Sequence, residues 1–183
     1  NHADLRVRHG LRIHGQITTD AKPIPALVSR RLAEGLEPSE AFRRSVNEFE
    51  GSVAIAATSA TDAGSLLLAL RGSGQGLFVG IADDRFIVAS EPYGVVEETE
   101  RFVRMDGENG GEVLALDASR AGTLEGIRRW RYDGVEAPIG DGEVQIAEVT
   151  TRDIDRGSAR HFLLKGITEA PTSLRKTLRG RIV

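Results

Sequence analysis

Six short apolar runs follow one another between residues 52 and 117, and their spacing limits the folds open to this chain. Turn-forming residues separate most of them, a pattern that predicts β-strands. Strands so close in sequence predict antiparallel pairing, because a parallel connection needs a dozen or more residues. The runs are SVAIAA (52–57), SLLLALR (65–71), GLFVGIA (76–82), RFIVAS (85–90), RFVRMD (101–106) and EVLALD (112–117). VAIAA and LLLAL are apolar at nearly every position, which predicts strands covered on both faces.

Two amphipathic helices are predicted before the strands. In PIPALVSRRLAEGLEP (23–38), Leu27, Val28 and Leu32 recur at helical spacing, and Gly35 is a stop signal. PSEAFRRSVNEFEG (38–51) follows at once, and its predicted inward stripe is Ala41, Phe42, Ser45, Val46 and Phe49. A helix pair followed by many strands predicts an α+β fold.

The last third of the chain changes character. Residues 121–141 alternate once around Ile127 and then become rich in Gly, Pro and Asp, so we place a domain boundary after residue 142. A connector over 143–156 and a closing helix over 157–179 are predicted to follow. Because Pro171 lies inside that helical pattern, we expect a kink or a break into two helices near Ala170.

The charge and the composition exclude several classes of function. The net charge is −3, and acidic and basic residues are interspersed, so neither nucleic acid nor a membrane is an expected partner. No apolar run approaches the roughly 20 residues that span a bilayer, and a cytoplasmic protein is expected. Because there is no cysteine, these 183 residues contain no disulfide, no thiolate metal site and no cysteine nucleophile.

Two further groups of residues are weak candidates for a site. His2, His9 and His14 lie close in sequence, but their spacing matches no common zinc pattern, so exposed or hydrogen-bonded histidines are expected and no metal. RGSGQG (71–76) is glycine-rich, yet a phosphate-binding loop opens a helix, whereas here another strand follows. We therefore interpret it as a connection between strands, whose bare backbone a ligand could still approach closely.

QITTDAKPIP (16–25) is the most informative short stretch. Thr19 and Asp20 stand just before a predicted helix, where such side chains often cap free backbone N–H groups. A carboxylate in this position can equally receive the ammonium group of an amino-acid substrate. The residues alone leave both interpretations open.

A family resemblance favours the second interpretation. QITTDAKPIPALVSRRLAEG and AFRRSVNEFEGSVAIAA resemble the glutaminase domain of the glucosamine-6-phosphate synthase family, the isomerizing glutamine–fructose-6-phosphate aminotransferases. LALRGSGQGLFVGI is similar to that family's Arg-x-Gly-Ser stretch. DRGSARHFLLKGITEAPTSLRKTLRGRI resembles the segment that joins its glutaminase domain to the first sugar-isomerase (SIS) domain. The resemblance runs in order along nearly the whole chain.

The resemblance implies a fold and a domain organisation. Residues 1–142 are expected to be the C-terminal portion of a class II (type 2) glutamine amidotransferase domain, and 143–183 the linker and the start of the first SIS domain. The fold implied is part of an αββα N-terminal-nucleophile (Ntn) hydrolase sandwich with mainly antiparallel sheets, followed by a linker helix.

The resemblance also implies a reaction and its partners. The complete enzyme hydrolyses glutamine with an N-terminal cysteine and transfers the ammonia to fructose 6-phosphate, bound elsewhere, without a cofactor. The expected partners are glutamine, the N-terminal segment, the SIS domains and further copies of the enzyme. Asp20 would bind the α-amino group of glutamine with Thr19 beside it. No catalytic residue is expected within this chain, which alone should be inactive.

Some residues depart from the family pattern. Ala21-Lys22 stand where Thr-Glu is usual, and DASRAGTLEGIRRWRYDGVEAPIGDG (117–142) is an extra stretch, so a divergent branch is a possible outcome. The competing hypothesis is a non-catalytic domain derived from the same fold, which would bind a metabolite or a partner subunit through an open sheet edge.

Overall fold

The computed structural model describes residues 1–72, 74, 76–148 and 155–179. Its chain divides into one unit of residues 1–148 and a second of residues 149–183. Part of the predicted connector and two residues of RGSGQG, Ser73 and Gln75, lie outside the described residues. The predicted domains, 1–142 and 143–183, stay predictions.

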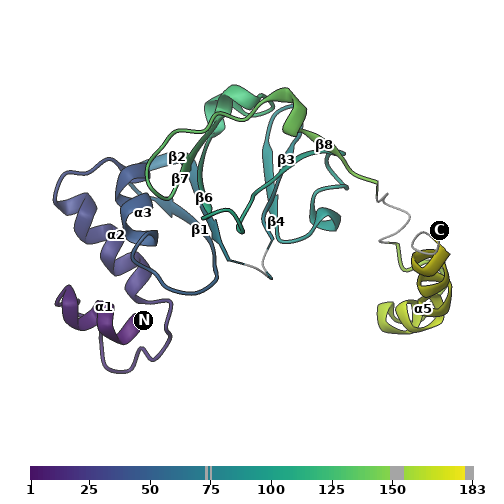
Figure 1. The fold of residues 1–183 in the computed structure, drawn as a ribbon, viewed down its shortest axis with the longest axis horizontal. Helices are drawn as coiled ribbons and strands as arrows, with labels where there is room; N and C mark the ends of the chain where they lie inside the picture. Colours follow the sequence, from purple (N-terminus) through teal and green to yellow (C-terminus); the bar gives the residue numbers. More distant parts are fainter. Residues whose placement is uncertain (73, 75, 149–154, 180–183) are drawn as a thin grey trace. The chain divides into compact units, whose positions relative to one another are not determined.

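Two four-stranded antiparallel sheets make up most of the first unit (Figure 1). Sheet A has the order β1-β2-β6-β7, and its strands are β1 Val53–Ser59, β2 Asp62–Arg71, β6 Glu112–Asp117 and β7 Ile127–Arg131. Sheet B has the order β4-β3-β5-β8, and its strands are β3 Phe78–Ile81, β4 Phe86–Ala89, β5 Arg101–Arg104 and β8 Gln145–Ile146. Helices together with antiparallel sheets confirm the predicted α+β class.

Strand β2 contributes to two hydrophobic cores at once. Leu67 and Ala69 pack toward the helices, in a core with Phe42 and Val46. Leu68 and Leu70 point the other way and pack against sheet B. The helix pair, sheet A and sheet B are therefore three successive layers, and the prediction of a strand covered on both faces is confirmed for LLLAL. The second helix layer of an αββα sandwich stays a prediction.

Strand β1 differs from the prediction. VAIAA was expected to be covered on both faces, but Ala54 and Ala56 are exposed. The reason is topological, because β1 is the edge strand of sheet A and pairs with β2 alone among the described residues. Composition indicates what a strand can bury, whereas its position in the sheet decides what it does bury.

The predicted helix pair is confirmed as α2 (Pro23–Ala33) and α3 (Pro38–Val46). A further helix, α1 (His2–Arg8), was not predicted from the sequence. Only one of its residues, Leu5, is buried, so its sequence carries no apolar stripe.

Short turns and 3₁₀ helices lie between many of the strands. Asp83 and Asp84 form the tight turn between β3 and β4, and a short 3₁₀ helix, Pro92–Gly94, follows β4. Strand β7 was not predicted, because three of its five residues are arginine. It pairs with β6 all the same. Three further 3₁₀ helices span Ala118–Arg120, Leu124–Gly126 and Asp141–Glu143.

The second unit contains the closing helix, α5 (Phe162–Arg179). A kink or a break into two helices was expected near Ala170. The helix is continuous through Pro171, so the break is wrong. It begins at Phe162 rather than at the predicted Gly157. Its large apolar side chains are exposed, among them Leu163, Ile167 and Leu174. Within the described residues, no helix is both long enough and apolar enough to cross a membrane.

An ion pair on α3 makes a testable contribution to stability. Arg43 donates two hydrogen bonds of 2.8 Å to Glu40, and they lower the pKa of the Glu40 carboxyl from 4.5 to about 2. A lowered pKa stabilises the fold above the ordinary value, so this contribution is lost as pH falls from 4.5 toward 2. We expect a loss of at most about 1 kcal/mol, because the pair is partly exposed.

Urea unfolding at pH 6 and pH 3 tests this contribution. Glu40→Gln is expected to lose less stability between the two pH values than the unchanged chain. Equal losses in the two proteins would contradict the assignment.

Candidate functional site

Asp20 lies at a cavity in the first unit. It is exposed, in the turn that precedes α2, and it lines a hollow of about 270 Å³. The opposite walls come from the start of α1, with Asn1 and His2, and from the start of β1, with Ser52 and Ala54. Three segments far apart in sequence therefore meet beside one carboxylate.

The carboxylate of Asp20 is not used by the neighbouring helix. The N-cap of α2 is Lys22, and no side chain caps this helix. Thr19 makes a local turn instead, in which its hydroxyl accepts a 3.3 Å hydrogen bond from the backbone N–H of Ala21. The capping interpretation of Thr19 and Asp20 is therefore wrong. No ion pair to Asp20 forms among the residues that the structure describes.

Thr19 and Asp20 face different hollows. Thr19 lines a mainly apolar groove of about 670 Å³ between α2 and β1, together with Ile24 and Val28. Of the two predicted site residues, only Asp20 lines the smaller cavity beside Asn1. Asp20 therefore lines the smaller cavity, whereas the hydroxyl of Thr19 is hydrogen-bonded within the turn.

The amide of Asn1 joins two walls of the Asp20 cavity. Its Nδ2 donates to the carbonyl oxygen of Glu48 at 2.8 Å, and its Oδ1 accepts from the backbone N–H of Glu50 at 3.3 Å. These bonds fix the start of α1 to the turn between α3 and β1. Sequence reasoning assigned no such role to Asn1, because its partners lie nearly 50 residues away.

A cluster of charged side chains is hydrogen-bonded to Glu48, in the turn between α3 and β1. Glu48 accepts hydrogen bonds from Arg31 and from His9, the latter at 2.6 Å, and Arg31 also donates to Ser45 at 2.8 Å. Burial opposes ionisation of Glu48, but the bonds from His9 and Arg31 outweigh it and lower the pKa of its carboxyl. His9 was expected to be either exposed or hydrogen-bonded, and it is hydrogen-bonded.

The other two candidate histidines, His2 and His14, do not form a cluster with His9. His2 and His14 are exposed, and Nδ1 of His14 accepts from the backbone N–H of Gln16 at 3.3 Å. Within the part of the chain that the structure describes, no three His, Asp or Glu side chains could hold a metal ion together.

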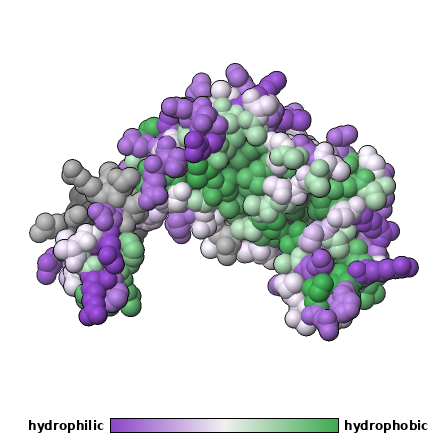
Figure 2. All heavy atoms as spheres, turned by 180° about the vertical axis from the view of Figure 1, so that it is seen from behind, coloured by the Kyte–Doolittle hydropathy of each residue, from purple (hydrophilic) through white to green (hydrophobic). Residues whose placement is uncertain are grey.

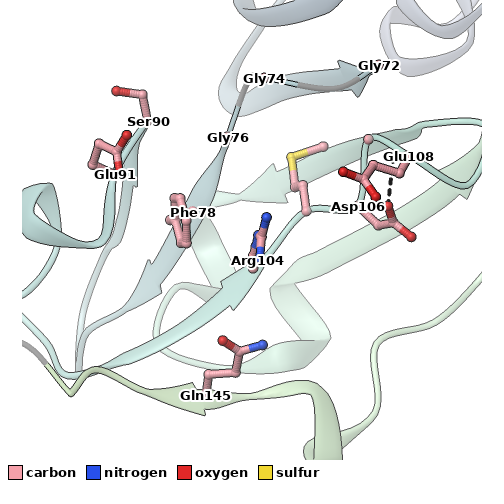
Figure 3. A pocket seen from close by; sticks show the side chains of 12 residues that line it. Gly72, Gly74, Gly76, Phe78, Ser90, Glu91, Arg104, Asp106, Glu108 and Gln145 are labelled. Atoms are coloured by element: carbon pink, nitrogen blue, oxygen red, sulfur yellow. Dashed lines mark hydrogen bonds between the residues drawn. The ribbon is translucent and has the colours of Figure 1, made fainter. Parts of the chain in front are cut away.

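The glycine-rich loop borders a separate cavity of about 660 Å³ (Figure 3). Gly72 follows the last residue of β2, and Gly76 precedes β3, so the loop joins sheet A to sheet B as a connection between strands. Arg104 points into this cavity, with its guanidinium 6.0 Å from the ring centroid of Phe78. Asp106 lies nearby, and hydrogen bonds, first from Asn109, lower the pKa of its carboxyl.

Another charged cluster, around Arg129, has a structural role. Arg129 on β7 donates to Glu112 at 3.3 Å and to Glu143 at 2.7 Å. Burial raises the pKa of the Glu112 carboxyl. Because Arg129 also donates to the carbonyl of Ala137 at 2.6 Å, the cluster ties the segment after β7 to sheet A.

Comparison with known proteins gives one consistent result. The chain is similar to enzymes named glutamine–fructose-6-phosphate aminotransferase (isomerizing). It is 29% identical over 177 residues to that of Methanothermobacter thermautotrophicus, 31% over 164 residues to that of Geobacillus kaustophilus and 31% over 174 residues to that of Listeria innocua. These matches cover 95%, 89% and 93% of this chain, and they confirm the resemblance seen in its motifs.

The matches cover much less of the relatives themselves. The chain spans 28%, 25% and 26% of their lengths, or about a quarter. No protein-family model matches the chain.

Proposed function

We propose that this relative of the isomerizing glutamine–fructose-6-phosphate aminotransferases is the part of such an enzyme that holds the α-amino group of glutamine. The whole reaction would move the amide nitrogen of glutamine to fructose 6-phosphate and yield glucosamine 6-phosphate. Residues 1–142 would belong to the glutamine amidotransferase domain, and 143–183 to the linker and the start of the first SIS domain.

The exposed carboxylate of Asp20 is the observation that carries this proposal. It lines a cavity of about 270 Å³, and it has no ion-pair partner within the described residues. An ammonium group is its natural ligand, because a charge-assisted hydrogen bond is about twice as strong as a neutral one. Glutamine carries that group on its α-carbon, at the end of the molecule opposite the amide that reacts.

The chemistry of amide cleavage separates the residues that bind glutamine from the residue that attacks its amide. Cleavage through an acyl intermediate needs an activated nucleophile, which in this family is implied to be a cysteine thiol. The 183 residues contain no cysteine, so they can orient glutamine and shape its cavity but cannot supply that thiol. In this proposal, the nucleophile comes from polypeptide outside these residues.

The complete product of the gene tests the proposal. We expect it to form glucosamine 6-phosphate from fructose 6-phosphate and glutamine, and the 183-residue chain alone to release no ammonia from glutamine. Product is measured by mass spectrometry, and ammonia by a coupled dehydrogenase assay.

Two outcomes would contradict the proposal. Ammonia release by the purified 183 residues would show that no outside thiol is needed. A complete product that neither cleaves glutamine nor aminates fructose 6-phosphate would remove the assigned reaction. The unchanged complete product, incubated with glutamine but without the sugar phosphate, serves as the control for uncoupled hydrolysis.

A further inference from the structure

The turn between β5 and β6 carries an Asn-Gly pair at its tip, where Asn109 and Gly110 are both exposed. Figure 2 shows hydrophobic residues gathered over the sheets on the face seen from behind, whereas residues 106–110, DGENG, have no apolar side chain. The tip is therefore held by hydrogen bonds rather than by packing. Exposed loop tips of this kind are where a folded chain is most open to chemical change.

The hydrogen bonds of this turn end at Asn109. Oδ1 of Asp106 accepts from the backbone N–H of Glu108 at 2.8 Å and from that of Asn109 at 3.4 Å. The side-chain amide of Asn109 donates through Nδ2 to the other carboxylate oxygen of Asp106. The next backbone N–H, that of Gly110, makes no hydrogen bond to any residue that the structure describes. The nitrogen that follows Asn109 in the chain is therefore free of a competing partner.

Gly110 adds no steric barrier at this nitrogen. Its φ is +91°, which favours glycine, and a Cβ built on it would meet no atom within 4 Å. A side chain on the residue after an asparagine hinders the approach of its backbone nitrogen to the asparagine amide, and glycine has none. Because the space around Gly110 is open, the backbone can rotate and bring its nitrogen to Cγ of Asn109.

The chain contains two other asparagines, and both are held by hydrogen bonds. The amide of Asn1 is bonded through its nitrogen and its oxygen to backbone groups of the turn after α3. Asn47 is the C-cap of α3, and the N–H of the next residue, Glu48, donates to the carbonyl oxygen of Ser45 at 3.2 Å. Of the three asparagines, all within the described ranges, Asn109 is the one that combines a following glycine with a free N–H.

We propose that Asn109 is a site of spontaneous deamidation, in which the backbone nitrogen of Gly110 attacks the side-chain amide and forms a succinimide. The N–H of Gly110 gives its proton to hydroxide, its nitrogen bonds to Cγ of Asn109, and the bond from Cγ to Nδ2 breaks. Nδ2 takes a proton from water and leaves as ammonia. Water then opens the ring at either carbonyl, which yields aspartate or isoaspartate. Asparagine is one of the thermolabile residues for this reason.

The product changes the charges at the cavity that Figure 3 shows. A carboxylate would replace the amide that donates to Asp106, and this donated bond is the first cause of the lowered pKa of the Asp106 carboxyl. Deamidation therefore raises the pKa of Asp106, because two carboxylates then stand together. Asp106 and Glu108 line the cavity of about 660 Å³, so its rim becomes more negative. Isoaspartate also lengthens the backbone of the turn.

Peptide mapping of the purified protein, incubated at pH 8 and at pH 6, tests the proposal. Trypsin cuts after arginine, so residues 105–120 carry Asn109 as their only asparagine, and residues 45–71 carry Asn47. We expect the first peptide to gain about 1 Da with time as the amide becomes an acid, and the second to keep its mass. Because the attacking nitrogen must lose a proton, the gain should be at least about tenfold faster at pH 8.

The products identify the route of the reaction. Opening of a succinimide gives both aspartate and isoaspartate, whereas direct hydrolysis of the amide by water gives aspartate alone. We therefore expect two new forms of the 105–120 peptide, equal in mass and separated by chromatography. An unchanged 105–120 peptide, equal gains in the peptides of Asn109 and Asn47, or aspartate alone would each overturn the proposal.

Asn109→Gln is the matched variant. Glutamine keeps the amide, but its longer side chain must close a larger ring, so the 105–120 peptide of the variant should keep its mass over the same time. Asn47→Gln is expected to leave the gain at Asn109 unchanged. A mass gain in Asn109→Gln equal to that of the unchanged protein would contradict the assignment.

The ammonia released at Asn109 is distinct from that of the proposed glutamine cleavage. It forms without glutamine and stops at one molecule per chain, whereas an enzyme turns over repeatedly. A blank without glutamine therefore measures it separately. The mapping result does not depend on whether the complete product aminates fructose 6-phosphate, so each proposal can fail without the other.

Discussion

Replacing Asp20 by alanine in the complete enzyme is expected to raise the KM for glutamine by about 10- to 100-fold. The reason is the loss of a hydrogen-bonded contact between the carboxylate and the ammonium group, which contributes about 1.5–3 kcal/mol. Because the contact forms before amide cleavage and persists through it, kcat should change much less than KM. Steady-state kinetics with glutamine as the varied substrate provides the measurement.

Two variants control for indirect effects of this substitution. Asp20→Asn keeps the size of the side chain and removes its charge, so it should lose most of the affinity that alanine loses. Asp83→Ala removes an exposed carboxylate from the turn between β3 and β4 and should leave KM unchanged. An unchanged KM in Asp20→Ala would show that the carboxylate does not hold glutamine.

Phe42→Ala is expected to lower the free energy of unfolding by about 3–5 kcal/mol. Phe42 is 0% exposed and belongs to the core between the helix pair and sheet A. Truncation removes its buried apolar surface and leaves a cavity that the surrounding side chains fill only in part. Calorimetry should show a melting temperature lower by roughly 6–20 °C for a chain of this size.

Phe162→Ala is the matched control for the core substitution. It removes the same atoms from α5, where Phe162 is 63% exposed. Its effect should stay within about 0.5 kcal/mol, as for most surface substitutions. Similar losses from the two phenylalanines would contradict the assignment of Phe42 to the core.

Local sequence patterns predicted the elements that carry their own apolar signal. The helix pair was found because its apolar residues recur at helical spacing, and the six strands because they are short apolar runs, most of them separated by turn-forming residues. The α1 helix, β7 and β8 were missed, because α1 buries a single leucine, β7 is largely arginine and β8 has only two residues. In β7, Arg128 lies 4.7 Å from the ring of Trp130, and its pairing with β6 holds it in the sheet. The pairing of β7 with β6 depends on the tertiary fold, and it produces no apolar periodicity in the sequence of β7.

The candidate site was only partly accessible from the sequence. Asp20 was singled out by a family motif, and the structure adds that α2 does not use its carboxylate as a cap. The bonds that shape the cavity, from Asn1 to the turn after α3 and from His9 to Glu48, join residues 39 to 49 positions apart. A single sequence gives no signal for such pairs, because nothing local distinguishes their members.

The position of β2 between two cores affects how the first unit unfolds. Its successive leucines are shared between the layer of helices and the layer of sheet B. If either layer separates from sheet A, one face of β2 becomes exposed to solvent. Local melting on either side therefore removes the support of the other, and the two cores are gained and lost together in one cooperative step.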